Sequence, residues 1–157
     1  MAKHPGWTRQ FLSEADFDAI TRAIKTAEAR TSAEIRVHLE RRVPRRLWLG
    51  RAPEVMTRAQ HVFRRLGMHR TAERHGVLIY LAVEDRRFAV VGDEGIHGRV
   101  GDPHWHRVRD LMVEKLRSSA PREAIERAVE ELGRTLAEHY PRRPDDKNEL
   151  SDEVSVS

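Results

Sequence analysis

The stretch Gly76-Val77-Leu78-Ile79-Tyr80-Leu81-Ala82-Val83 decides the fold, because it is nearly all apolar and rich in β-branched residues. Such a short, uninterrupted run is typical of a central strand that is buried on both faces. Glu84-Asp85-Arg86 follows as a turn, and Phe88-Ala89-Val90-Val91 supplies the next strand. Strands joined by so short a turn form a hairpin, so these two are predicted to be antiparallel.

Another strand is predicted over Glu34-Ile35-Arg36-Val37-His38-Leu39-Glu40, where apolar and polar residues alternate strictly. This alternation indicates one buried and one half-exposed face. His38 lies on the polar face, where it is expected to be a surface residue. A helix connects this strand to the central one, and a right-handed crossover through it makes the two strands parallel.

The spacing of apolar residues predicts four helices, at residues 12–30, 53–66, 105–116 and 121–136. In the first helix, Ser13 is placed to cap the N-terminus and Asp16 to complete a capping box. Residues 92–103 contain four glycines and are predicted to form a flexible loop.

The predicted fold is therefore α/β: a small mixed β-sheet, with a parallel pair plus an antiparallel hairpin strand, sandwiched between helices on both faces. The length of 157 residues fits one domain, placed here at residues 12–141. Residues 1–11 form an N-terminal arm, and residues 142–157 form an acidic C-terminal tail that we expect to dock partly on the body.

Composition excludes several classes of protein. The chain has no cysteine, which excludes disulfides, thiolate zinc sites and cysteine nucleophiles. It shows no G-x-S-x-G, P-loop or H-E-x-x-H motif. There is no secretory signal pattern and no run near the ~18 apolar residues of a membrane span. We therefore expect a cytoplasmic protein.

An arginine-rich stretch, residues 41–51, lies in the basic half of the chain. Residues 1–75 carry 16 Lys/Arg against 8 Asp/Glu, whereas residues 76–157 carry 13 against 17. Five arginines beside a tryptophan suit a nucleic acid or an anionic membrane surface: Arg41, Arg42, Arg45, Arg46 and Arg51. A solvated loop explains the same residues without any ligand, and no nucleic-acid motif accompanies them.

Acidic residues collect at the end of the predicted sheet where the parallel strands begin and the hairpin's second strand ends. Carboxylates on a glycine-rich loop are the ligands that calcium, magnesium or manganese takes. The predicted metal ligands are Asp93, Glu94, Asp102 and Glu34. Solvated acids on a glycine-rich turn would look the same, so that alternative stays open.

Accessory residues for this site are predicted nearby and in the tail. Arg74, His75 and His97 are expected at the same end of the sheet. The positive charge of Arg74 could neutralise a carboxylate or hold an anion there. Asp145 and Asp146 are placed either to complete a cation site or to pair with arginines. No catalytic residue is predicted.

Four stretches, in order, carry a resemblance to a known family: residues 31–40, 66–80, 88–97 and the tail Asp145-Asp146-Lys147-Asn148-Glu149-Leu150. Over about residues 11–155 the chain resembles the TPM domain family, and specifically its small free-standing bacterial members. This family includes a thylakoid-lumen acid phosphatase. The resemblance implies an α/β sandwich, binding of divalent cations, notably calcium, and for the plant relative phosphatase activity.

The resemblance also implies which residues of this sequence fall in the motifs of the family. Asp93 and Asp102 fall in the family's glycine-rich acidic loop, and Glu34 falls in a matching motif, as does Arg74. Two positions depart from the family pattern: the usual R-N-G reads Arg74-His75-Gly76, and His97 stands where a glutamate is usual. The cation preference is expected to differ accordingly.

Three functions follow from these observations. The first is a divalent-cation module, most readily for calcium, without a catalytic signature and acting through a partner protein. The second is a metal-dependent phosphatase acting on phosphomonoesters, in which the metal activates water. The third is binding of an anionic membrane or a nucleic acid by the arginine-rich stretch.

Overall fold

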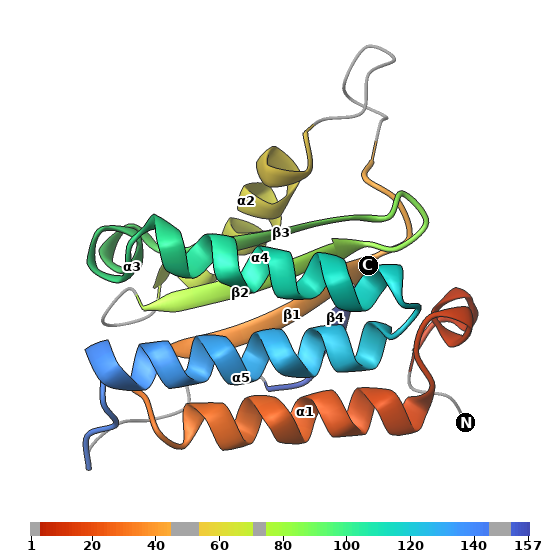
Figure 1. Cartoon of the computed structure of the whole chain (residues 1–157). Coiled ribbons are helices and arrows are strands. Elements are labelled where there is room, and N and C mark those ends of the chain that lie inside the picture. The colour runs from red at the N-terminus through yellow and green to blue at the C-terminus, as the bar shows by residue number, and fades with distance from the viewer. Residues whose placement is uncertain (1–3, 45–53, 71–74, 145–151) are drawn as a thin grey trace.

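The structure of the chain is a computed structural model that describes residues 4–44, 54–70, 75–144 and 152–157 (Figure 1). At positions 97 and 98 it describes the backbone alone. Arg74, Asp145 and Asp146, together with residues 45–51 of the arginine-rich stretch, lie outside the described residues.

One four-stranded sheet, in the order β3-β2-β1-β4, forms the centre of the fold. β1 (Glu34–Glu40) pairs in parallel with β2 (Gly76–Ala82), and β2 pairs antiparallel with β3 (Arg87–Gly92). The predicted parallel pair and hairpin are therefore confirmed. The two-residue strand β4 (Ser155–Val156), parallel to β1 on its outer edge, was not predicted.

Helices cover both faces of the sheet, as predicted (Figure 1). Three long helices lie on one face: α1 (Glu14–Glu28), α4 (Asp102–Arg117) and α5 (Pro121–His139). α2 (Val55–Arg65) packs on the other face. Short 3-10 helices occur at Gly6–Gln10 and Met68–Arg70. Among the described residues, no helix has the length and apolarity that crossing a bilayer requires.

The alternation in β1 separates two cores. Its residues Ile35, Val37 and Leu39 join the large core under α1, α4 and α5. The opposite face was predicted to be half-exposed, and this prediction is wrong for most of it, because Glu34, His38 and Glu40 are only 5%, 2% and 5% exposed. α2 packs on this side of the sheet and the C-terminal segment pairs with the outer edge of the strand, so its polar groups must find partners inside the protein.

The prediction of a glycine-rich loop at residues 92–103 is also wrong, because residues Glu94–Val100 form a helix, α3. Ile96 is fully buried in the large core, and its amide donates to the Asp93 carbonyl at 2.9 Å. Burial of this one apolar side chain and the packing of α3 on α5 offset the poor helix propensity of the glycines.

The first helix begins with the predicted capping box. The Ser13 hydroxyl accepts from the Asp16 amide at 3.0 Å, and the Asp16 carboxylate accepts from the Ser13 amide at 2.9 Å. Ser13→Ala is expected to lower the free energy of unfolding by about 1 kcal/mol, because the Asp16 amide loses its acceptor and the capping box is broken. Urea denaturation measures it. Ser13→Asp should stay within a few tenths of wild type, and equal losses in both variants would contradict the cap.

α1 and α5 approach each other closely at one point. Gly133 of α5 faces Ala27 of α1, and a Cβ placed on Gly133 would lie 2.7 Å from the Cβ of Ala27. Carbon atoms that do not bond pack no closer than about 3.5 Å. A glycine at this position is therefore required by the spacing of the two helices.

Candidate functional site

Strand pairing brings Glu34 and Asp93 to one end of the sheet, on either side of Gly76. The Glu34 amide donates to the His75 carbonyl at 3.0 Å, and the Asp93 amide donates to the Gly76 carbonyl at 2.9 Å. Glu34 pairs in register with Gly76 at the start of β2. Two carboxylates thus flank a position that has no side chain of its own. We call this part of the molecule the acidic end.

Glu28, the last residue of α1, adds a buried carboxyl group next to β1. Its Oε2 atom accepts from the Ile35 amide at 3.0 Å, and the residue is only 5% exposed. Burial, followed by the neighbouring charges of Glu34 and Asp152, raises the pKa of Glu28 to about 10, although the Ile35 hydrogen bond opposes this. Glu28 is therefore held in its protonated form at neutral pH, mainly by its burial.

Asp93 has one satisfied and one unsatisfied carboxylate oxygen. Oδ1 accepts from the Glu94 amide at 2.8 Å at the start of α3. Oδ2 is buried and has no hydrogen-bond partner within the described ranges. A buried acceptor without a partner is costly and uncommon in folded proteins.

Aromatic rings fix the start of α3 beside these carboxylates. The Tyr140 hydroxyl donates to the Gly95 carbonyl at 2.9 Å, and its ring lies 3.8 Å from the ring of His75. The Arg99 guanidinium lies over the Tyr140 ring at 5.3 Å. Burial and then the charge of Arg99 lower the pKa of His75, and the charge of Asp93 opposes them. The neutral imidazole ring of His75 therefore packs against the ring of Tyr140.

The other predicted ligands differ from this pair in their exposure. Glu94 and Asp102 are the first residues of α3 and α4, and both are exposed. The seven-residue helix α3 separates Asp102 from Asp93. His97 lies within α3, and its side chain is not described. In the part of the chain that the structure describes, no three His, Asp or Glu side chains form a metal-binding group.

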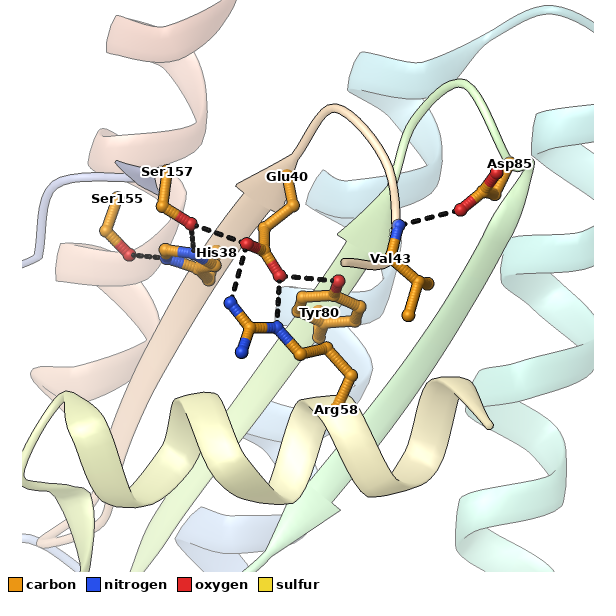
Figure 2. Close-up of polar contacts among 8 residues, drawn as sticks. All are labelled: His38, Glu40, Val43, Arg58, Tyr80, Asp85, Ser155 and Ser157. Atoms are coloured by element: carbon orange, nitrogen blue, oxygen red, sulfur yellow. Dashed lines mark hydrogen bonds and ion pairs between the residues drawn. The ribbon is translucent and has the colours of Figure 1, made fainter. Parts of the chain in front are cut away.

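A second polar cluster, which the sequence analysis missed, is built around Glu40 at the opposite end of β1 (Figure 2). Its carboxylate accepts from Arg58 Nε and Nη2 at 2.6 and 2.8 Å, from the Tyr80 hydroxyl at 2.7 Å and from the Ser157 hydroxyl at 2.9 Å. Burial alone would raise the pKa of Glu40, but the hydrogen bonds from Arg58, Tyr80 and Ser157 lower it to about 2. Glu40 is therefore ionised throughout the physiological range.

His38 extends this cluster to the C-terminal segment. Its Nδ1 lies 2.6 Å from Ser155 Oγ, and its Nε2 lies 2.8 Å from Ser157 Oγ. Burial lowers the pKa of His38 to about 4, so the ring is neutral and has one donor and one acceptor nitrogen. Because Ser157 donates to Glu40, the network assigns Nε2–H as the donor to Ser157. Nδ1 then accepts from the Ser155 hydroxyl, which also lies within donating distance of the Val37 carbonyl, at 3.3 Å.

The signal for this cluster was present in the sequence but ambiguous. Alternation in β1 identified the face that carries His38 and Glu40, yet nothing in the pattern says that a helix and a distant strand cover it. Two arginines of the arginine-rich stretch are among the described residues. Arg41 and Arg42 pair with Glu84 at 2.9 and 2.7 Å, on exposed side chains. Arg45, Arg46 and Arg51 lie outside the described residues.

Comparisons with known proteins agree with this architecture. A solved structure, the NMR structure of BA42 protein from the psychrophilic bacterium Bizionia argentinensis sp. nov., is 36% identical and superposes with a TM-score of 0.84. The match covers 94% of this chain and 96% of that one. No curated protein matches. The family model described as the TPM domain matches residues 8–135, and the chain therefore belongs to the TPM domain family.

Proposed function

We propose that this chain binds a divalent cation, with calcium preferred, at its acidic end, and that Asp93 and Glu34 supply ligands. The observation that carries the proposal is the buried Oδ2 of Asp93, which has no partner among the described residues. A cation beside this oxygen would satisfy it. The negative charges of Glu34 and Asp152 beside Glu28 favour a cation at the same end.

The kind of ion follows from the donor atoms. Carboxylate oxygens suit calcium, magnesium and manganese, and calcium accepts six to eight oxygens in irregular arrangements. Asp93 and Glu34 account for only part of such a shell. The remaining ligands would be water or other acidic residues, with Glu94, Asp102, Asp145 and Asp146 still predicted as candidates.

The binding is expected to depend on pH because Glu28 is protonated in the folded protein. A group with a raised pKa binds more protons when folded than when unfolded, so its contribution to stability falls as pH rises above 4.5. A cation at this end lowers the pKa of Glu28 and takes the place of its proton. Cation affinity should therefore increase from pH 6 to pH 8.5.

Thermal unfolding of the chelator-stripped protein tests the proposal. Calcium at ten times its dissociation constant adds about 1.4 kcal/mol to the free energy of unfolding, which raises the melting temperature by roughly 3–6 °C. Asp93→Asn should abolish most of this rise, because the amide keeps the acceptor for Glu94 but removes the charge. Asp110→Asn is the matched control, since Asp110 is exposed on α4.

Three outcomes would overturn or relocate the site. No shift with either calcium or magnesium contradicts cation binding at these conditions altogether. A calcium shift that Asp93→Asn and Glu34→Gln leave intact places the ion elsewhere. A shift that is equal at pH 6 and pH 8.5 contradicts the role of Glu28, which Glu28→Gln isolates because its side-chain oxygen still accepts from Ile35.

The absence of any catalytic motif leads us to propose action through a partner rather than turnover. A metal-dependent phosphatase is the alternative, and it predicts hydrolysis of p-nitrophenyl phosphate that needs the cation and disappears in Asp93→Asn. A third function, binding of anionic membranes or nucleic acid by the arginine-rich stretch, predicts affinity that falls steeply with salt.

A further inference from the structure

Residues 152–157 lie along the outer edge of β1 as an added strand. Ser155 and Val156 pair in parallel with His38 and Leu39, and the Ser157 amide donates to the Leu39 carbonyl at 3.0 Å. β1 pairs through all seven of its residues with β2 on its other side. The outer edge of β1 therefore holds its neighbour by far fewer backbone contacts than the inner edge.

The added segment is recognised on both of its faces. Val154 is 5% exposed and belongs to the large core, and Val156 packs against the same core. Ser155 and Ser157 point the other way, toward His38 and Glu40 (Figure 2). The edge thus recognises an alternating pattern of apolar and hydroxyl side chains, as expected when an extended peptide extends a sheet.

The hydroxyl positions are chemically selective. Ser157 Oγ accepts from His38 Nε2 at 2.8 Å and donates to Glu40 at 2.9 Å, so this position needs a group that does both. An alanine there leaves the buried ring nitrogen of His38 unpaired. An aspartate there would place a second negative charge beside the carboxylate of Glu40.

The strand pairing that holds the segment is short, whereas Val154 in the large core and Asp152 beside Glu28 anchor its start. Its regular pairing is two residues long, Ser157 is exposed, and Ser155 and Val156 are only partly buried. A site that is specific in chemistry but covered by so short a strand is suited to exchange. We propose that the outer edge of β1 is a docking site for an extended segment of a partner protein with the pattern apolar–Ser/Thr–apolar–Ser/Thr, which residues 154–157 occupy until the partner displaces them.

The groups that recognise the serines, His38 and Glu40, lie at the opposite end of β1 from the acidic end, whereas the segment begins at Asp152, which interacts with Glu28. The test is fluorescence anisotropy of a labelled peptide, Asp-Glu-Val-Ser-Val-Ser, added to the full chain without divalent cations. Two full-length variants release the chain's own segment: Val154→Asp/Val156→Asp, and Ser155→Asp/Ser157→Asp. The second pair changes only exposed or partly exposed side chains, so the body of the protein should fold.

The released variants are expected to bind the peptide at least about tenfold more tightly than wild type, where the tethered segment competes at high effective concentration. The peptide with both serines replaced by alanine should bind at least about tenfold more weakly, because His38 and Glu40 lose their partners. Equal binding of both peptides, or no binding to either released variant, would overturn the proposal. So would a wild-type dimer formed by exchange of these segments, detected by light scattering.

Discussion

Arg58→Met is expected to lower the free energy of unfolding by about 3–5 kcal/mol, the usual loss when one partner of a buried ion pair is removed. The side chains of Arg58 and Glu40 are only 14% and 6% exposed, and two hydrogen bonds join them. The methionine fills similar space but leaves the Glu40 carboxylate charged in a buried place. Tyr80 and Ser157 remain as its only described donors.

Denaturant unfolding at several pH values measures this effect. The pKa of Glu40 lies at about 2 in the folded protein, below its ordinary value of 4.5, so its contribution to stability is present above pH 4.5 and is lost as pH falls toward 2. The difference between Arg58→Met and wild type should therefore shrink below pH 4.5. Arg109→Met, on an exposed position of α4, is the matched control. A loss below about 1 kcal/mol would contradict the buried pair.

Gly133→Ala is expected to destabilise the protein by about 2 kcal/mol, although alanine is the better helix former by about 1 kcal/mol. The added methyl carbon would lie 2.7 Å from the Cβ of Ala27, so the two helices must separate or bend. Because α1 and α5 both border the large core, a shift of either helix disturbs packing well beyond the point of contact.

Exchanging the two residues provides the control. Ala27→Gly alone should cost about 1 kcal/mol through helix propensity. The double variant Ala27→Gly/Gly133→Ala moves the methyl group from one helix to the other and should approach wild-type stability. Denaturation midpoints of the four proteins give the coupling energy. Additive losses would show that the spacing of the helices does not require the glycine.

The centre of the fold follows from the sequence because burial dictates its pattern. Strict alternation gave the observed bounds of β1, Glu34–Glu40, and the apolar run gave β2 to within one residue at its end. The turn between β2 and β3 has Arg86 at φ 54°, the left-handed conformation of a tight turn. These elements are specified by neighbouring residues, so a single sequence suffices to predict them.

The elements that were missed depend on contacts between distant parts of the chain. β4 is two residues long, and its pairing partner lies more than a hundred positions away, so no local pattern marks it. α3 contains glycines that favour a loop, and the burial of Ile96 decides otherwise. At the acidic end, Asp93 and Glu34 were predicted from strand order, whereas the roles of Glu28 and Tyr140 depend on packing.

The two faces of the sheet are covered unequally, and this affects how the molecule opens under native conditions. On one side three helices and a large core must separate together, whereas on the other α2 is a single helix of 11 residues over a smaller cluster. Among the helices that cover the sheet, α2 is then the one that detaches at the lowest free energy. Arg58 leaves with it, so water reaches Glu40 before the rest of the core is exposed. Amide protons beneath α2 would consequently exchange with solvent through this opening, while those under α1 and α5 wait for global unfolding.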